Sequence, residues 1–286
     1  MTATPRLHPV APPDVPLAYR TAGTGQKDVL LVHGWVSSSR MWAGLMHTLA
    51  PHFRCWAPDL PGHGDSPLPP GQIPTLADFR GAVRNFCRSL AIRPYAIIGH
   101  SLGALITLAM ALEMPEATEM RLGLLSPPVT GRLGMRIDAL LRTRTGAALF
   151  RRSRRLWPLL MPAGLPTVFA PTPTHLWDKL RAEQRKLQDA RRAQWGAVVG
   201  GALAAARNDL SPHLPRIQQP ALVIVGTLDL TIPRSEAELA ASRLPNARLV
   251  RLPGVGHQVT DEAPEIVYPL LLDFLLKPEE SPDASA

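Results

Sequence analysis

A serine flanked by glycines at the end of an apolar run constrains this chain more than any other feature. The run reads Tyr95-Ala-Ile-Ile-Gly-His-Ser-Leu-Gly-Ala104. A β-strand that turns at once into a helix, with a serine on the corner, needs small residues two positions before and after it; Gly99 and Gly103 supply them. Such a corner strains the backbone of Ser101 and lifts its hydroxyl clear of the sheet, as a nucleophile requires. The same pattern arises by chance in many proteins, so the rest of the chain has to decide.

Further apolar runs predict a sheet around this strand. A continuous apolar run is typical of a parallel strand buried on both faces, and helix-like segments separate the runs. This alternation predicts an α/β fold with a mostly parallel central sheet flanked by helices. The alternating residues 15–23 predict an exposed antiparallel edge strand, and residues 263–276 a closing amphipathic helix. The other predicted strands are residues 28–34, 53–59, 121–128, 221–226 and 247–252. The other predicted helices are residues 37–49, 75–90 and 102–113, and one through residue 235.

Residues 129–207 interrupt the alternation. A chain of 286 residues slightly exceeds the size at which one core stops growing. This segment has no buried-strand run, only helix-like pieces at about 135–150 and 174–193. We therefore expect a helical cap inserted between two parts of one core, residues 1–128 and 208–276, followed by a disordered tail, 277–286. The insertion holds fifteen Arg or Lys against four Asp or Glu, so most of the basic character lies there.

Composition excludes several classes of function. The net charge of +8 raises the question of nucleic acid, but no nucleic-acid module pattern accompanies it, so no such partner is expected. No apolar run reaches the roughly 18–20 residues of a membrane span, and the N-terminus lacks the apolar core of a secretory signal. Cys55 and Cys87 sit in apolar patterns and are predicted to be reduced, in a cytoplasmic protein. Neither metal-ligand spacing nor a phosphate-binding loop occurs, so no metal and no cofactor are expected.

Three residues fall at comparable places along the predicted sheet. Ser101, Asp229 and His257 each follow the carboxyl end of a predicted strand, and ligands bind at that edge of an open parallel sheet. A serine hydroxyl needs a neighbouring imidazole to take its proton, and the imidazole needs a carboxylate to fix its tautomer. The three residues therefore form a candidate Ser-His-Asp triad.

Several segments, taken in order, resemble the α/β-hydrolase superfamily over essentially the whole chain outside the insertion. They are His33-Gly34-Trp35, Asp59-Leu-Pro-Gly-His-Gly-Asp-Ser66, Gly99-His-Ser-Leu-Gly103, Gly226-Thr-Leu-Asp-Leu-Thr-Ile-Pro233 and Gly254-Val-Gly-His257. Some members place the acid after the preceding strand, but Leu125-Ser-Pro-Pro128 has none, which leaves Asp229. Asp261 and Glu262 are expected to cap the last helix instead. A serine at the elbow disfavours the dehalogenases and epoxide hydrolases of this superfamily, which use aspartate there.

The resemblance also implies the supporting residues. The oxyanion donors are the backbone N–H of Leu102 and that of Trp35, which follows His33 and Gly34. The indole of Trp35 either points to the acyl pocket or packs in the core. His33 and His63 are expected to hold loops by hydrogen bonds, and His100 to be positional.

In capped members of this superfamily the segment corresponding to residues 129–207 covers the active site. Its large apolar residues are candidates to line a cavity, although most are expected to hold the cap together. They are Leu140, Leu141, Phe150, Leu156, Trp157, Leu160, Met161, Phe169 and Trp195. The run Arg151-Arg-Ser-Arg-Arg155 is either a solvated face or a contact for an anionic substrate or surface.

The sequence therefore predicts a cofactor-independent serine hydrolase that cleaves a carboxylic ester of a small or medium-sized apolar substrate. Hydrolysis of a carbon–carbon bond, a thioester or a lactone stays open, as does a non-catalytic ligand-binding role. The partner is a small-molecule substrate, and the oligomeric state is left open.

Overall fold

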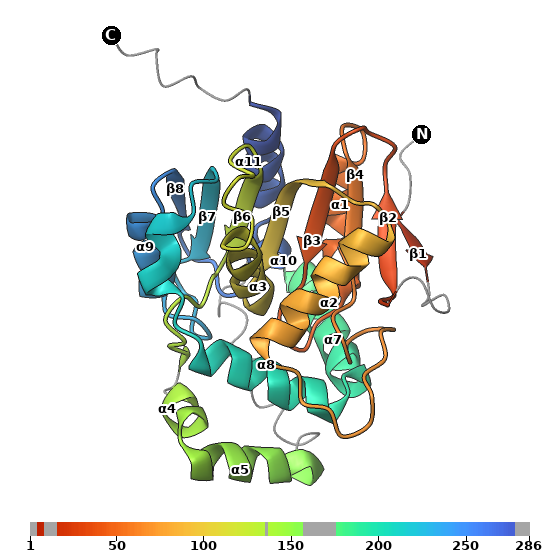
Figure 1. Ribbon diagram of the computed structural model, residues 1–286. Helices are drawn as coiled ribbons and strands as arrows, with labels where there is room; N and C mark the ends of the chain where they lie inside the picture. The colour runs from red at the N-terminus through yellow and green to blue at the C-terminus, as the bar shows by residue number, and fades with distance from the viewer. Residues whose placement is uncertain (1–4, 9–15, 135–136, 157–175, 278–286) are drawn as a thin grey trace.

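The computed structural model describes residues 5–8, 16–134, 137–156 and 176–277, and in them an eight-stranded sheet in the order β1-β2-β4-β3-β5-β6-β7-β8 (Figure 1). In this order the strands from β4 to β8 run parallel, β2 pairs antiparallel with β4, and β1 pairs antiparallel with β2, which confirms the predicted α/β fold. The strands are β1 Arg6–His8, β2 Tyr19–Ala22, β3 Asp28–Val32, β4 Arg54–Pro58, β5 Pro94–His100, β6 Arg121–Leu125, β7 Ala221–Gly226 and β8 Ala247–Leu252.

The prediction that residues 15–23 form an edge strand is wrong. β2 lies between β4 and β1, with Leu7 opposite Arg20 in the antiparallel pair, so β1 is the edge. The three residues of β1 include only one apolar side chain, Leu7, which is 43% exposed. A strand that short carries no periodic signal, and its place depends on backbone hydrogen bonds to a distant segment.

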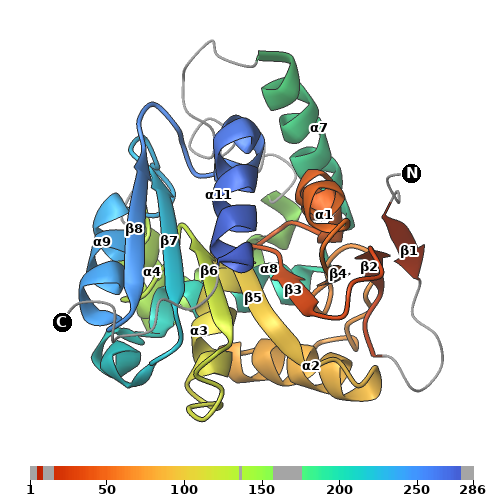
Figure 2. The same cartoon turned by 90° about the horizontal axis from the view of Figure 1, so that it is seen from above.

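Helices cover both faces of the sheet, as Figure 2 shows from above. Alternate strand residues point to opposite faces: Leu30 and Ile97 pack with α2 and α3, whereas Leu31 and Ile98 pack with α1 and α11. Thr75 begins α2 with a capping box, in which its side chain and that of Asp78 each accept from the other's backbone N–H. The helices of this part are η1 Ser39–Trp42, α1 Ala43–Leu49, α2 Leu76–Ser89, α3 Leu102–Ala111, η5 Ser211–Arg216, α9 Arg234–Arg243, α10 Val259–Glu262 and α11 Pro264–Leu276.

Between β6 and β7 the regular structure of the described residues is all helical and contains no strand. Thr143 separates the predicted helix at 135–150 into two, because its side chain accepts from Gly146 N and caps the second helix. Figure 1 shows α4 and α5 beyond α8, on the side away from the sheet. The helices are α4 Ile137–Arg142, α5 Arg144–Arg152, η3 Ser153–Leu156, α7 Leu176–Arg192 and α8 Trp195–Arg207.

The sequence reading missed α8. Its residues from Ala197 to Ala206 are all buried, because α8 contacts α2 and α3 as well as α4 and α5. A helix buried on every side carries no amphipathic period, and its alanines, valines and glycines read as unpatterned. In the described part of the chain, no helix is both long and apolar enough to span a bilayer. The expected polar tail lies outside the described residues, apart from Lys277.

Candidate active site

The corner between β5 and α3 has the strained backbone that its sequence predicts. Ser101 adopts φ 53° and ψ −117°, a combination that residues with a side chain rarely adopt. A Cβ on Gly99 would lie 2.3 Å from the carbonyl oxygen of Gly103, and one on Gly103 would lie 2.0 Å from that of Val32. Backbone segments therefore approach too closely at both positions for any residue except glycine.

Asp229, which follows β7, and His257, which follows β8, form a hydrogen-bonded pair. Oδ2 of Asp229 lies 2.8 Å from Nδ1 of His257, while Oδ1 accepts hydrogen bonds from the backbone N–H groups of Thr231 (2.9 Å) and Ile232 (2.8 Å). The side chain of Asp229 is fully buried and that of His257 is 5% exposed. A carboxylate accepts hydrogen bonds, so Nδ1 of His257 is the donor in this pair, and Nε2 lies on the side of the ring away from Asp229.

His100 connects the serine corner to the loop after β8 that carries His257. Its Nε2–H donates to the backbone oxygen of His257 at 2.9 Å, and the two rings lie 4.7 Å apart. Burial holds the pKa of His100 well below its usual range, so the ring is neutral. Because Ser101 follows His100 directly, this bond brings the segment after β8 to the serine corner across two intervening strands.

The loop after β3 also packs against the serine corner. The backbone of Gly34 runs against the corner, since a Cβ there would lie 3.3 Å from that of Ser101. Nε2 of His33 accepts from the N–H of Leu60 at 2.9 Å, so Nδ1 carries the proton and donates to the oxygen of Gly34 at 2.8 Å. That oxygen belongs to the peptide whose N–H is Trp35, and a donor on the oxygen makes the N–H a stronger donor. Burial lowers the pKa of His33 to about 4, so it stays neutral at pH 7.

A family model described as the alpha/beta hydrolase family matches residues 29–270, which include every one of these segments. The chain belongs to this family.

Several known proteins are similar to this chain over nearly its whole length. The magnesium-chelatase 30 kDa subunit of Rhodobacter capsulatus is 30% identical over 276 residues, covering 91% of this chain and 92% of that protein. A pimeloyl-[acyl-carrier protein] methyl ester esterase of Edwardsiella ictaluri is 29% identical, covering 90% and 96%. A thermophilic esterase of Thermogutta terrifontis has a solved structure that superposes with a TM-score of 0.76 at 26% identity, covering 91% and 92%.

Within this α/β hydrolase, Trp35 packs against α8. Its Nε1–H donates to the oxygen of Val198 at 2.8 Å. Gly201 is tight against the same indole, because a Cβ there would lie 2.5 Å from Cδ1 of Trp35 and 3.2 Å from Cδ2 of Leu102. Of the two alternatives for the indole, the structure therefore favours packing.

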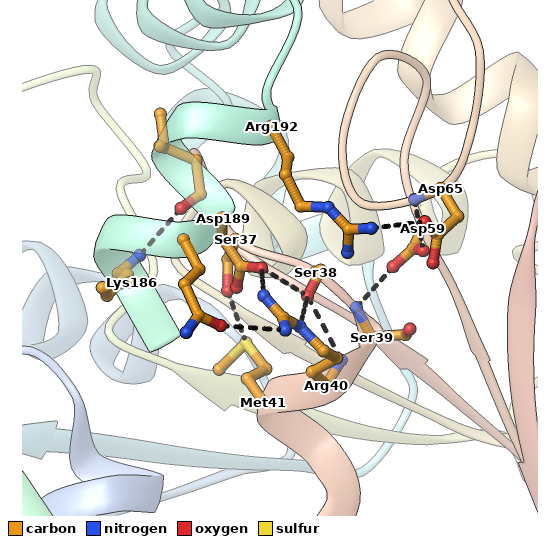
Figure 3. Close-up of polar contacts among 12 residues, drawn as sticks. Ser37, Ser38, Ser39, Arg40, Met41, Asp59, Asp65, Lys186, Asp189 and Arg192 are labelled. Carbon is orange, nitrogen blue, oxygen red and sulfur yellow. Dashed lines mark hydrogen bonds and ion pairs between the residues drawn. The ribbon is translucent and has the colours of Figure 1, made fainter. Parts of the chain in front are cut away.

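The loop of residues 59–66 has a structural role. Asp59 accepts from the N–H of Ser39 at 2.6 Å and from that of Asp65 at 3.0 Å, so it ties two loops together (Figure 3). His63 faces the ring of His33 at 5.4 Å, and Nδ1 lies 3.1 Å from the oxygen of Pro61. Burial lowers the pKa of His63 to about 3, which keeps the ring neutral.

The sequence reading missed a buried charged cluster on α7. Asp189 accepts from Ser38 Oγ at 3.0 Å and pairs with Arg40 (Figure 3). Nζ of Lys186 lies 3.3 Å from the oxygen of Trp35 and 3.5 Å from that of Val36. Lys186 is only 7% exposed, and burial lowers its pKa to about 8.

A signal for this cluster was present in the sequence. Lys186 and Asp189 occur at helical spacing with Ala182 and Ala190, which are also buried, so two charges occupy the apolar stripe of α7. Charged residues in such a stripe are buried only when they have partners. Here the partners come from the loop after β3.

The expectation that Asp261 and Glu262 cap the last helix is wrong. Asp261 pairs with Arg185 of α7 at 2.6 Å. Glu262 accepts from the N–H groups of Gly256 (3.0 Å) and Gln258 (3.2 Å), so it holds the loop that carries His257. Their partners are distant in sequence or belong to the preceding loop, which a reading of local capping signals does not reveal.

The remaining candidates are placed as follows. Leu141 is buried beside α8, Phe150 and Trp195 lie 5.6 Å apart, and Leu140 and Leu156 are about half exposed. The candidates Trp157, Leu160, Met161 and Phe169 lie outside the described residues. Cys55 and Cys87 are both buried and free. Among the described residues, no group of three or more His, Cys, Asp or Glu is arranged to hold a metal ion.

Proposed function

We propose that this α/β hydrolase is a serine hydrolase that cleaves carboxylic esters through an acyl-serine intermediate. The observation that carries the proposal is the buried Asp229–His257 pair at 2.8 Å, joined through His100 to a strained serine corner. The names of two relatives support ester cleavage, namely the methyl ester esterase of Edwardsiella ictaluri and the esterase of Thermogutta terrifontis.

In the proposed reaction Nε2 of His257 takes the hydroxyl proton of Ser101 while Oγ bonds to the ester carbonyl carbon. The carbonyl electron pair moves to oxygen, and Asp229 stabilises the imidazolium. The intermediate collapses as the C–O bond to the alcohol breaks, and His257 gives its proton to the leaving oxygen. Water then repeats the sequence on the acyl-serine, which releases the acid and restores the hydroxyl of Ser101.

Two backbone N–H groups are proposed to hold the oxyanion, those of Leu102 and Trp35. Leu102 is the first residue of α3, where the helix dipole also favours negative charge. Trp35 is held by its bond to α8, and its peptide is polarised through His33. Donors fixed in advance stabilise the developing charge without having to reorganise.

The substrate is proposed to be a small or medium-sized apolar ester, and the helices between β6 and β7 are proposed to act as a cap over it. The contact of Trp35 with α8 supports this placement, because it connects that helix to the oxyanion loop. Hydrolysis of a thioester, a lactone or a carbon–carbon bond remains the alternative for the same triad. The free, buried cysteines support a reducing compartment such as the cytoplasm.

The proposal is tested with a fluorophosphonate probe and a series of nitrophenyl esters of increasing acyl length. We expect the wild-type protein to be labelled and to hydrolyse the esters, and Ser101→Ala to do neither. Absence of labelling in a folded wild-type protein, or equal labelling of Ser101→Ala, would overturn the proposal. A vinylogous diketone cleaved much faster than every ester would favour the carbon–carbon alternative.

A further inference from the structure

A cavity of about 830 Å³ lies among the loop after β4, the end of α7 and the start of α8. Its volume is in the range of sites that bind small molecules, roughly 300–1,000 Å³. Most of its wall is apolar. The main apolar residues are Leu68, Pro69, Ile73, Leu187, Trp195 and Val199.

This cavity is distinct from the candidate active site. Its described lining residues do not include Ser101, Asp229 or His257. α8 forms part of the wall through Val199, whereas the oxygen of Val198 accepts from Trp35 at the oxyanion loop. The cavity therefore borders α8 but is not lined by the proposed nucleophile or its partners.

Four arginines line the cavity, from two stretches of chain about forty residues apart. They are Arg151, Arg154, Arg191 and Arg192. Arg192 pairs with Asp65 at 3.3 Å. The other three side chains make no ion pair and no hydrogen bond with any residue in the described ranges. Three arginines that have no counter-ion among the described residues thus line one apolar cavity.

The two properties together specify a class of ligand. Arginines that only face solvent do not require an apolar cavity beside them. An apolar cavity without charged residues would not distinguish a charged ligand from a neutral one. A guanidinium binds a carboxylate with two parallel hydrogen bonds, and burial of an alkyl chain contributes about 0.8 kcal/mol per CH₂.

We propose that this cavity binds an anionic amphiphile, a long-chain carboxylate, as a second site separate from the proposed active site. The chain lies against Leu68, Ile73 and Val199, and the carboxylate is held by Arg151, Arg154 and Arg191. The inference depends on the cavity and its charges and holds whether or not Ser101 is a nucleophile.

The test measures binding by calorimetry on the full chain carrying Ser101→Ala, so that turnover cannot interfere. The probes share one chain length and are used below their micelle concentrations: dodecanoate, dodecanol and dodecyltrimethylammonium. We expect dodecanoate to bind at least tenfold more tightly than the other two, and more weakly as salt rises.

Two variants locate the site. The double variant Arg154→Gln/Arg191→Gln is expected to weaken dodecanoate binding at least tenfold, and Ile73→Trp, at a partly buried position of the cavity wall, is expected to fill the cavity and weaken dodecanol as well. Arg248→Gln, on the exposed side of β8, is the matched control and is expected to change nothing. Because the substituted arginines are exposed, the charge variant should keep the melting temperature of its parent.

Three outcomes would overturn the inference. They are equal affinity for the anionic and cationic probes, unchanged binding in the double arginine variant, and binding to phosphatidylglycerol vesicles without binding of monomeric dodecanoate. The last would assign the arginines to a membrane surface. Fluorophosphonate labelling of the Ser101-containing protein is scored separately, so the proposed function and this site can fail independently.

Discussion

At the scale of single residues, the proposed chemistry depends on how firmly Asp229 is held. Its two carboxylate oxygens accept from an imidazole and from two backbone N–H groups, all between 2.8 and 2.9 Å. This arrangement leaves the carboxylate one orientation. It also sets the tautomer of His257, which a weaker or rotated acceptor would not do.

Asp229→Asn is therefore expected to lower kcat by about 10³–10⁴-fold on a nitrophenyl ester. The amide keeps the size of the carboxylate but favours the wrong imidazole tautomer and does not stabilise the imidazolium. The measurement is kcat together with the rate of fluorophosphonate labelling, and the melting temperature serves as the control for folding. A loss of less than threefold in a folded variant would remove Asp229 from the mechanism.

Lys186 provides a second test at this scale, because its charge is buried and its Nζ lies near the backbone oxygens of Trp35 and Val36, in the loop that carries one proposed oxyanion donor. Lys186→Met keeps the length of the side chain and removes the charge, so we expect kcat to fall about tenfold, as for loss of one to two kcal/mol of transition-state stabilisation. The same variant is expected to be more stable at pH 7, because burial lowers the pKa of Lys186 and its charge therefore disfavours the folded state.

The pH dependence of the free energy of unfolding tests the buried charge of Lys186 separately from its effect on kcat. The pKa of Lys186 is lowered to about 8 in the folded protein and is near 10.4 in the unfolded chain. Between these values the unfolded state binds more protons, so wild-type stability rises with pH relative to Lys186→Met. Urea unfolding from pH 7 to 10 measures this difference. Lys277→Met, on an exposed side chain paired with Asp273, is the control; equal pH profiles in all three proteins would contradict the expectation.

At the scale of elements, the serine corner requires glycine because three segments of backbone meet there. Gly103→Ala would place a Cβ 2.0 Å from the carbonyl oxygen of Val32, and neither backbone can move without disturbing β3 or α3. We expect the free energy of unfolding to fall by at least about 2 kcal/mol.

Gly81 is the matched control for that substitution. It lies inside α2, and a Cβ there meets no atom within 4 Å. Gly81→Ala is expected to increase stability by about 0.5–1 kcal/mol, because alanine loses less backbone entropy in a helix. Chemical denaturation of both variants makes the comparison, and a similar effect of the two changes would show that close packing does not set the corner.

Across the whole molecule, buried neutral histidines connect the core to acid stability. Burial lowers the pKa of His33 to about 4 and that of His63 to about 3, against about 6.5 in the unfolded chain. Below pH 6.5 the unfolded state therefore binds more protons, and each histidine removes up to about 1.4 kcal/mol per pH unit. We expect the free energy of unfolding to fall by several kcal/mol between pH 7 and 5. Urea titrations at these two pH values measure the loss. An unchanged unfolding midpoint would contradict the expectation.

The parallel strands of the core and the segments around Ser101, Asp229 and His257 were predictable because their signals are local. A strand buried on both faces must be continuously apolar, and a sharp corner must have its glycines at fixed spacing. The edge strand β1 and the helix α8 were not predictable in this way. One is too short to show a period, and the other is buried all round, so neither displays an amphipathic pattern.

The sequence by itself determined the family, the α/β fold and the candidate triad, since each follows from residue types at set distances along the chain. Only the tertiary structure decided which segments meet: Asp229 with His257, Arg185 with Asp261, Lys186 with the loop after β3, and around one cavity several arginines that have no ion pair among the described residues. The first three contacts join residues that are 28 to 151 positions apart in the chain, and the arginines come from separate helices. The physical reason is that burial and charge neutralisation depend on neighbours in space, which no local pattern specifies.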